Sequence, residues 1–421
     1  MAKNLLQELL LGQWRDPDVR ENVTLPVQEI VIENNITARA PEYLEKYQAR
    51  RFLLVADETT YEVQGRAIEE NIKRKGWEIS SLILKNGIEA AMENIAGIKT
   101  RAAAAEIIIG VGSGTISDLC KYSAFLLKIP YVVFATAPSM NGYASANASL
   151  KIGKYKKSLP AQMPAGIYFD LDILAKAPER LIKSGIGDLL CRPSAEADWR
   201  LSHLLLGTPF KTAPFALLKE NEKQLYESAA EMLKGDMAAM RILAEGLILS
   251  GIGMYICGGS QPASQGEHLI AHYMEMLHPE LPKTFHGEQI GVTTLTMLDI
   301  QAQLLGNEIS AGDYKASEEK IIRTLGMEIG VQAARAVGNK AEAYKNSGAR
   351  EKINREWKTV AAEITPILAR KEKIYDILKT IGAPTTPADL GWSSHYPGAV
   401  SHAFMLRDRF TFLDIAHVAR L

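Results

Sequence analysis

The sequence predicts an α/β domain built on a parallel sheet, followed by an all-helical domain. Between about residues 28 and 175, short β-branched runs alternate with amphipathic segments, which is typical of βαβ units. Beyond about residue 178 this alternation stops, and long segments with a 3.6-residue apolar period take over. We therefore expect two domains, residues 1–178 and residues 179–421.

The first domain is expected to alternate strands and helices. The predicted strands cover residues 29–33, 51–56, 79–84, 106–110 and 131–135, and the last of them closes the series. The predicted helices cover residues 61–75, 88–100 and 113–127. The uninterrupted apolar run Ile107-Ile108-Ile109 fits a strand that is covered on both faces.

The second domain is expected to contain only helices. Its predicted helices cover residues 179–206, 219–234, 237–257 and 266–277, with more from residue 286 to the C-terminus. Residues 341–374 are rich in Lys, Glu and Ala, which predicts a solvated helical excursion.

Composition excludes several function classes. Of the 421 residues 47% are hydrophobic and 23% are charged, and the net charge is −1, so no basic field attracts nucleic acid or anionic lipid. The three cysteines form no CxxC pair and fit a reducing compartment. The N-terminus lacks the pattern of a signal peptide, and the apolar stretches are too short or too Gly-broken to span a bilayer. We expect a cytoplasmic protein without membrane partners.

Four of the eight histidines lie between residues 268 and 286, which predicts a metal site. His268 and His272 are four residues apart and share one helix face, while His286 begins the next apolar run. The alternative is that each is a helix-surface or capping histidine. Clustering favours the metal site, and only His278, which precedes Pro279, is interpreted as a surface or cap residue.

A glycine-rich turn joins the strand at 106–110 to the following helix. It reads Gly110-Val-Gly112-Ser113-Gly114, and glycines in such a turn let a phosphate approach the N–H groups of the helix N-terminus. A plain tight turn is the alternative. Asp57, which follows the strand at 51–56, can accept hydrogen bonds from both ribose hydroxyls or can be a turn or capping residue.

The strand at 131–135 leads into small and turn-forming residues, 136–145, which suit a loop around a ligand. A predicted hairpin follows, with four lysines that either attract a phosphorylated substrate or are solvated: Lys151, Lys154, Lys156 and Lys157.

These motifs occur in the same order as in one known family. They are the run from Gly112 to Lys121, the Thr-Ala-Pro-Ser loop from Thr136, Gly187-Asp188, Ala197-Asp198-Trp199, Gly-Glu-His268 and Phe-His286-Gly287. The chain resembles sn-glycerol-1-phosphate dehydrogenases of the AraM-like type, within the superfamily of iron-dependent alcohol dehydrogenases and dehydroquinate synthase. The similarity runs from about residue 28 to 300 and is most specific at residues 262–268.

The resemblance implies a dehydroquinate synthase-like fold and a set of site residues. The implied metal ligands are Asp188, His268 and His286, and His272 matches a substrate-contacting position. The implied cofactor-binding residues are Asp57, Gly112, Ser113, Gly114, Thr115, Asp118, Thr136, Ser139 and Ser145. Asn141 stands where many members carry aspartate, and Lys121 is either a cleft residue or a surface lysine, the latter being favoured.

Two further interpretations concern residues of these motifs. Asp188 follows Gly187 and opens a helical segment, so it can cap that helix; capping is compatible with metal ligation, and we favour ligation. Asp198-Trp199 is interpreted as a helix-packing pair.

One carboxylate and two imidazoles suit zinc or nickel, with iron(II) as a third candidate. The resemblance implies interconversion of dihydroxyacetone phosphate and sn-glycerol 1-phosphate with NAD, or NADP, by a homodimer. The alternatives are a polyol or glycerol dehydrogenase with an unphosphorylated substrate, a dehydroquinate-synthase-like lyase, and a non-catalytic metabolite-binding relative, which Asn141 motivates.

Overall fold

The computed structural model describes residues 5–369 and 371–419, which form two compact units. The sheet unit comprises Met1–Leu189 and Thr212–Gly259, and the helical unit comprises Leu190–Lys211 and Ser260–Leu421. Two long helices, α10 (Ala213–Met232) and α11 (Met237–Cys257), therefore group with the sheet. The division expected at residue 178, with cofactor binding before it and metal and substrate binding after it, stays a prediction.

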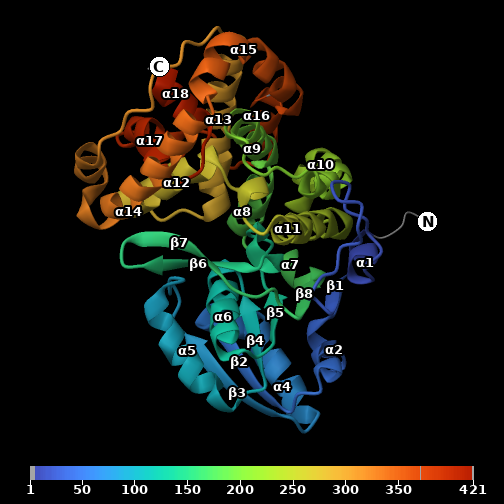
Figure 1. Cartoon of the computed structure of the whole chain (residues 1–421). Helices are drawn as coiled ribbons and strands as arrows, with labels where there is room; N and C mark the ends of the chain where they lie inside the picture. The colour runs from blue at the N-terminus through green and yellow to red at the C-terminus, as the bar shows by residue number, and fades with distance from the viewer. Residues whose placement is uncertain (1–4, 370, 420–421) are drawn as a thin grey trace. The chain divides into compact units, whose positions relative to one another are not determined.

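Six parallel strands form the main sheet in the order β1-β8-β5-β4-β2-β3 (Figure 1). They are β1 (Glu29–Glu33), β2 (Arg51–Asp57), β3 (Glu78–Leu84), β4 (Ile107–Gly112), β5 (Tyr131–Ala135) and β8 (Gly166–Asp170). The predicted parallel sheet is confirmed. The expectation that residues 131–135 close the series is wrong, because β8 returns after a two-stranded hairpin and pairs with both β1 and β5.

The sheet unit also contains this hairpin and ten α-helices among the described residues. The hairpin pairs β6 (Asn147–Ile152) with β7 (Tyr155–Pro160). Besides α10 and α11, the helices are α1 (Leu5–Leu10), α2 (Ala40–Leu44), α3 (Glu58–Thr60), α4 (Arg66–Arg74), α5 (Ile95–Arg101), α6 (Gly114–Leu127), α7 (Leu171–Leu174) and α8 (Glu179–Leu189). The predicted helix 61–75 begins with a π-helical turn at Tyr61–Gly65 before α4. The helix expected from residue 88 begins later, because Ala91 is extended and bridges to the hairpin.

Helices cover both faces of the sheet, as the apolar strands predict. One face packs with α2 and α4 through a cluster that includes Phe52, Leu54, Ile109 and Phe134. The other face lies against α6, which contacts β2, β4 and β5. Strands β4, β5 and β8 are buried along their whole length, which is typical of a parallel sheet covered on both sides.

Helix α11 is the one described helix long and apolar enough to cross a membrane by length and composition, so the expectation that every apolar stretch is too short or too Gly-broken is wrong for this helix. Two thirds of its apolar window, 67%, is buried in the structure, where α11 packs against α10. A mostly buried core helix passes the same test, so this helix is weak evidence for a membrane span.

Helices make up the described part of the helical unit, as predicted (Figure 1). They are α9 (Arg192–Leu206), α12 (Gly266–Leu277), α13 (His286–Gly306), α14 (Glu318–Asn346), α15 (Ala349–Ile364), α16 (Lys371–Thr380), α17 (Tyr396–His402) and α18 (Phe412–Ala419). The expected solvated excursion at 341–374 is wrong in part. Trp357 is buried and its Nε1 donates to the Leu304 carbonyl oxygen at 3.0 Å, so α15 packs on the core.

Candidate functional site

The chain changes direction across the sheet between β2 and β4. From β2 it crosses to the edge strand β3, and it then returns to the other side of β2 and continues through β4, β5 and β8. In open α/β sheets, ligands bind at such a switch point, beyond the carboxyl ends of the strands. Asp57 and Gly112 are the last residues of β2 and β4, so two predicted cofactor residues flank this point.

Asp57 caps helix α3. Its Oδ1 accepts a hydrogen bond from the Thr60 backbone N–H at 2.8 Å, and the Thr60 hydroxyl pairs with the Asp57 backbone N–H in return. The capping alternative is therefore present in the structure. Because this cap uses Oδ1, it is compatible with ribose binding by Oδ2, which stays a prediction.

The glycine-rich turn places the N-terminus of α6 directly after β4. A Cβ on Gly112 would lie 2.7 Å from the Ile116 side chain, so no larger residue fits there without a shift. Ser113 has extended backbone and its side chain makes no capping hydrogen bond. The first N–H groups of α6, near Gly114 and Thr115, are then available to an anion.

Lys121 is a buried residue of α6, so the surface interpretation is wrong. Its side chain is 0% exposed, and its Nζ donates to the carbonyl oxygens of Gly142 at 2.6 Å and Asn147 at 3.1 Å. It also donates to the Ser145 Oγ at 3.2 Å and lies 3.7 Å from Asp118 Oδ1. Burial lowers the pKa of Lys121, and the Asp118 carboxylate opposes that effect. Lys121 therefore fixes the loop after β5 to α6, and a catalytic role stays a prediction.

The loop after β5 is also tied to the neighbouring strand end. The Thr136 backbone N–H donates to the Gly112 carbonyl oxygen at 3.2 Å, and the Ser139 carbonyl oxygen accepts from Ser184 Oγ at 3.0 Å. Thr136 and Ser139 are each 7% exposed. The predicted cofactor residues Gly112, Thr136 and Ser139 thus lie along two adjacent strand ends of one sheet.

Lys151, the first of the four hairpin lysines, forms an ion pair. Lys151 pairs with Glu89, with its Nζ 2.9 Å from Oε2, and its side chain is 45% exposed. The Ser149 N–H donates to Asp118 Oδ2 at 3.2 Å, so β6 packs against α6. The pairing of Lys151 fits the solvated alternative for that residue.

Asn141 and Asp188 are in direct contact within the sheet unit. The Asn141 backbone N–H donates to Asp188 Oδ2 at 2.8 Å. Asp188 is 1% exposed and lies near the C-terminal end of α8, so the interpretation that it caps a helix N-terminus is wrong. The side-chain Nδ2 of Asn141 is buried and makes no hydrogen bond within the described part of the chain. A buried donor in this state can bond a ligand oxygen.

Gly185 lets α8 approach the loop after β5. A Cβ at this position would lie 1.8 Å from the Pro138 carbonyl oxygen, so even alanine would push the helix away. Asp188 is three residues further along the same helix. The close approach at Gly185 therefore places the Asp188 carboxylate beside Asn141.

Three histidine rings come together in the helical unit. His268 and His272 lie one turn apart on α12, each 5% exposed, and His286 is the first residue of α13. The Nε2 atoms of His268 and His286 are 3.2 Å apart. The His272 ring centroid is 5.9 Å from that of His268 and 6.1 Å from that of His286. The sequence prediction of a histidine cluster is confirmed as a spatial arrangement.

Glu267 orients His268, and the sequence analysis missed it. Its Oε1 lies 2.9 Å from His268 Nδ1 and accepts the Gln265 backbone N–H at 2.7 Å. Burial alone would raise the pKa of Glu267, but the hydrogen bond from His268, together with backbone hydrogen bonds such as that from Gln265, outweighs burial and lowers it. A carboxylate on Nδ1 leaves the lone pair on Nε2, the atom that faces His286. The only sequence signal was an acidic residue in the first turn of a helix.

Asp198 holds the start of α12. Its Oδ2 accepts the Gly266 N–H and its Oδ1 accepts the Phe412 N–H, both at 2.9 Å. Burial, together with the charge of Glu267, raises the pKa of Asp198 to about 8. Trp199 is also buried, and its Nε1 donates to the Pro209 carbonyl oxygen at 2.8 Å. The interpretation of this pair as packing residues is confirmed.

The donor set fits a divalent metal ion. Two imidazole nitrogens on one tetrahedral ion are separated by roughly 3.3 Å when each metal–nitrogen bond is about 2.0–2.1 Å. The Nε2–Nε2 distance of 3.2 Å in this structure matches that value. Asp188 is two residues before Leu190, where the chain enters the helical unit, and its membership of the same ligand set stays a prediction.

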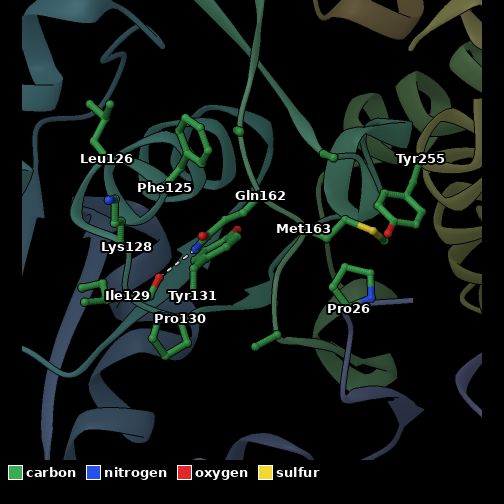
Figure 2. Close-up of a pocket in the computed structure, with 13 residues that line it drawn as sticks. Pro26, Phe125, Leu126, Lys128, Ile129, Pro130, Tyr131, Gln162, Met163 and Tyr255 are labelled. Atoms are coloured by element: carbon green, nitrogen blue, oxygen red, sulfur yellow. Dashed lines mark hydrogen bonds between the residues drawn. The ribbon is translucent and has the colours of Figure 1, made fainter. Parts of the chain in front are cut away.

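A separate groove of about 720 Å³ lies at the other end of the strands, beside the amino end of β5 (Figure 2). Pro130 and Tyr131, at the start of β5, line it. Gln162 Nε2 donates to the Ile129 carbonyl oxygen beside them at 2.7 Å. Because ligands of such sheets bind at carboxyl ends, this groove at the amino ends is not the nucleotide site.

The chain shares its fold with glycerol dehydrogenases and iron-containing alcohol dehydrogenases. The model of the iron-containing alcohol dehydrogenase family matches residues 31–178. A probable glycerol dehydrogenase from Sinorhizobium meliloti shares the fold with a TM-score of 0.62 at 18% identity, over 94% of this chain and 96% of that one. An archaeal alcohol dehydrogenase from a Red Sea brine pool has a TM-score of 0.65 at 13% identity, over 94% and 97% of the two chains.

Sequence relatives define the family more narrowly. A glycerol-1-phosphate dehydrogenase [NAD(P)+] from Bacillus velezensis is 32% identical over 291 residues, which are 68% of this chain and 74% of that protein. Proteins of the same name from Staphylothermus marinus and Bacillus subtilis are 35% and 27% identical, over 66% and 93% of this chain and 78% and 92% of theirs. The chain belongs to the glycerol-1-phosphate dehydrogenase family.

Proposed function

We propose that this protein is an NAD(P)-dependent, metal-dependent oxidoreductase that interconverts dihydroxyacetone phosphate and sn-glycerol 1-phosphate. This proposal is supported by the relatives described above, which are named glycerol-1-phosphate dehydrogenase [NAD(P)+]. The observation that carries the proposal is the pair of imidazole nitrogens, 3.2 Å apart, with a carboxylate behind one of them.

The proposed ligands of the ion are Asp188, His268 and His286. This mixed oxygen and nitrogen set suits zinc or nickel, with iron(II) as a third candidate. When bound, the cation supplies Lewis acidity toward the substrate oxygen, and the nicotinamide supplies or accepts the hydride. Glu267 keeps the His268 lone pair on Nε2, and its charge strengthens that nitrogen as a donor.

The remaining residues bind and orient the reactants. His272 lies near both ligand rings and can hold or transfer the hydroxyl proton, since an imidazole does so near neutral pH. Asn141 offers its buried Nδ2 to a substrate oxygen but cannot act as a base. The N-terminus of α6 binds the cofactor pyrophosphate, and Asp57 accepts hydrogen bonds from the ribose hydroxyls.

A spectrophotometric assay tests the proposal. Purified protein with zinc or nickel should oxidise NADH in the presence of dihydroxyacetone phosphate and not with dihydroxyacetone. Equal rates on both ketones would favour a polyol dehydrogenase. Bound NAD and metal without turnover on any polyol phosphate would favour a binding protein, and turnover of a dehydroquinate precursor would favour the lyase.

The ligand assignment has its own test. His268→Ala should lose the catalytic metal ion and the activity while circular dichroism stays unchanged. Activity at the wild-type level in this variant would refute the assignment. We also propose a cytoplasmic homodimer, which size-exclusion chromatography with light scattering and cell fractionation would check.

A further inference from the structure

A second group of metal-binding side chains lies in the helical unit, outside the proposed catalytic set. His278 follows the last residue of α12, Glu280 is two residues later, and His395 directly precedes α17. Each residue offers one ligand atom, and these atoms all lie within 4.8 Å of one another. The sequence separates His278 and His395 by more than a hundred residues, so only the fold brings them together.

The group contains a long hydrogen bond whose length is also that between two ligands of one ion. His278 Nδ1 and Glu280 Oε1 are 3.3 Å apart. An N–H···O bond is usually about 2.7–3.2 Å long, whereas two ligands on one tetrahedral zinc ion are roughly 3.3 Å apart. The His278 and His395 rings stack with centroids 4.0 Å apart and planes inclined by 30°, so both are within reach of one ion, and one ring turns about its side-chain torsions to direct its lone pair to it.

The backbone holds both sides of the group in place. His395 precedes α17 without a side-chain capping bond, and its backbone N–H already donates to the Trp392 carbonyl oxygen at 3.1 Å. Nearby, Gly391 has φ +71°, and a Cβ there would lie 3.0 Å from Pro282. The segments that carry His278 and His395 are therefore in van der Waals contact, which reduces the ordering needed to bind an ion.

The charge of the group favours a cation that can reach it from solvent. Glu280 supplies the one carboxylate of the group, beside two imidazoles. The Glu280 side chain is 61% exposed and that of His278 is 20% exposed. Two imidazoles and one carboxylate prefer zinc, nickel or copper to magnesium or calcium, and leave a position for water.

We propose that His278, Glu280 and His395 bind a divalent transition-metal ion, separate from the catalytic ion, that links the end of α12 to the start of α17. Helix α12 also carries His268 and His272, so an ion at its far end stabilises the element that presents both residues. The link does not depend on the proposed function, because none of its three ligands belongs to the catalytic set.

Metal content measured on the full chain tests this proposal. The protein is dialysed against a zinc buffer of fixed free concentration, and bound zinc is measured by mass spectrometry. His395→Ala should hold about one zinc equivalent less than the wild type, because two ligands no longer retain the ion. The matched control is His402→Ala on the same helix α17, whose Nδ1 bonds the Gly398 carbonyl oxygen outside the group and whose zinc content should be unchanged.

Two further variants keep the test decisive. Glu280→Gln changes an exposed side chain and should fold normally, while its zinc affinity at this site should fall at least tenfold. His268→Ala should lose the catalytic equivalent, and adding His395→Ala to it should remove a second one. Equal zinc content in wild type, His395→Ala and His402→Ala would overturn the proposal. This outcome does not depend on whether His268 binds the catalytic ion.

Discussion

Glu267→Gln tests how the carboxylate behind His268 acts on the proposed catalytic metal. Oε1 of Glu267 accepts from both His268 Nδ1 and the Gln265 N–H. An amide oxygen can accept both bonds, so the substitution keeps them and removes the charge, while the amide NH2 takes the place of the oxygen that accepts from Ser194 Oγ. A hydrogen bond to a charged group contributes about 1.5–3 kcal/mol, against about 0.5–1.5 kcal/mol for a neutral one.

The difference of about 1–1.5 kcal/mol predicts a tenfold loss of zinc affinity, within the 10–100-fold range typical of such carboxylates. Competition with a chromophoric chelator measures this affinity directly. The matched control is Glu69→Gln, because the hydrogen-bond partners of Glu69 in the structure are Tyr61, Lys73 and Ser81, which are not proposed ligands. Wild-type zinc affinity in Glu267→Gln would refute the reasoning, because the Glu267 charge would then make no contribution to the ligand set.

Three further predictions concern the sheet unit. Gly185→Ala places a Cβ 1.8 Å from the Pro138 carbonyl oxygen, so it should lower the free energy of unfolding by about 1–3 kcal/mol and reduce activity, and an unchanged urea midpoint would contradict this packing. Burial alone would raise the pKa of Glu69, but hydrogen bonds, foremost that from Lys73, lower it below 4.5, so its ionised form stabilises the fold above that pH. Wild-type stability should therefore fall toward that of Glu69→Gln as the pH drops below 4.5, and a constant difference in acid denaturation curves would argue against it. Asp57→Asn removes the charge that repels a 2′-phosphate and should lower the KM for NADPH relative to NADH, whereas an unchanged ratio would place Asp57 away from the ribose.

The regular elements could be predicted because their signals are local. Strand β1 and helices α11 and α12 have the predicted bounds, and β2 to β5 differ by no more than two residues. The apolar period of each segment is enough to assign its type. Strand β8 was missed because it follows a hairpin and is only five residues long, and its place between β1 and β5 is a long-range pairing.

The candidate site was predictable as a set of residues and less so as a set of roles. His268 and His272 share a helix face by spacing alone. The sequence favours a surface position for Lys121, because nothing in its neighbourhood indicates that the carbonyl oxygens of Gly142 and Asn147 surround its ammonium group. Glu267 was passed over, because an acidic residue at a helix start is common and only the fold shows its contact with His268.

By itself, the sequence determined the two kinds of domain, the histidine cluster and the glycine turn before α6, since each follows from the spacing of residues that are close in sequence. The tertiary structure decided the strand order and the partners of Lys121, Glu267 and Asn141. It also decided the meeting of His278 with His395, which are far apart in the chain. The physical reason is that periodicity reports which face of an element is buried, whereas contacts between distant segments depend on how those faces pack together.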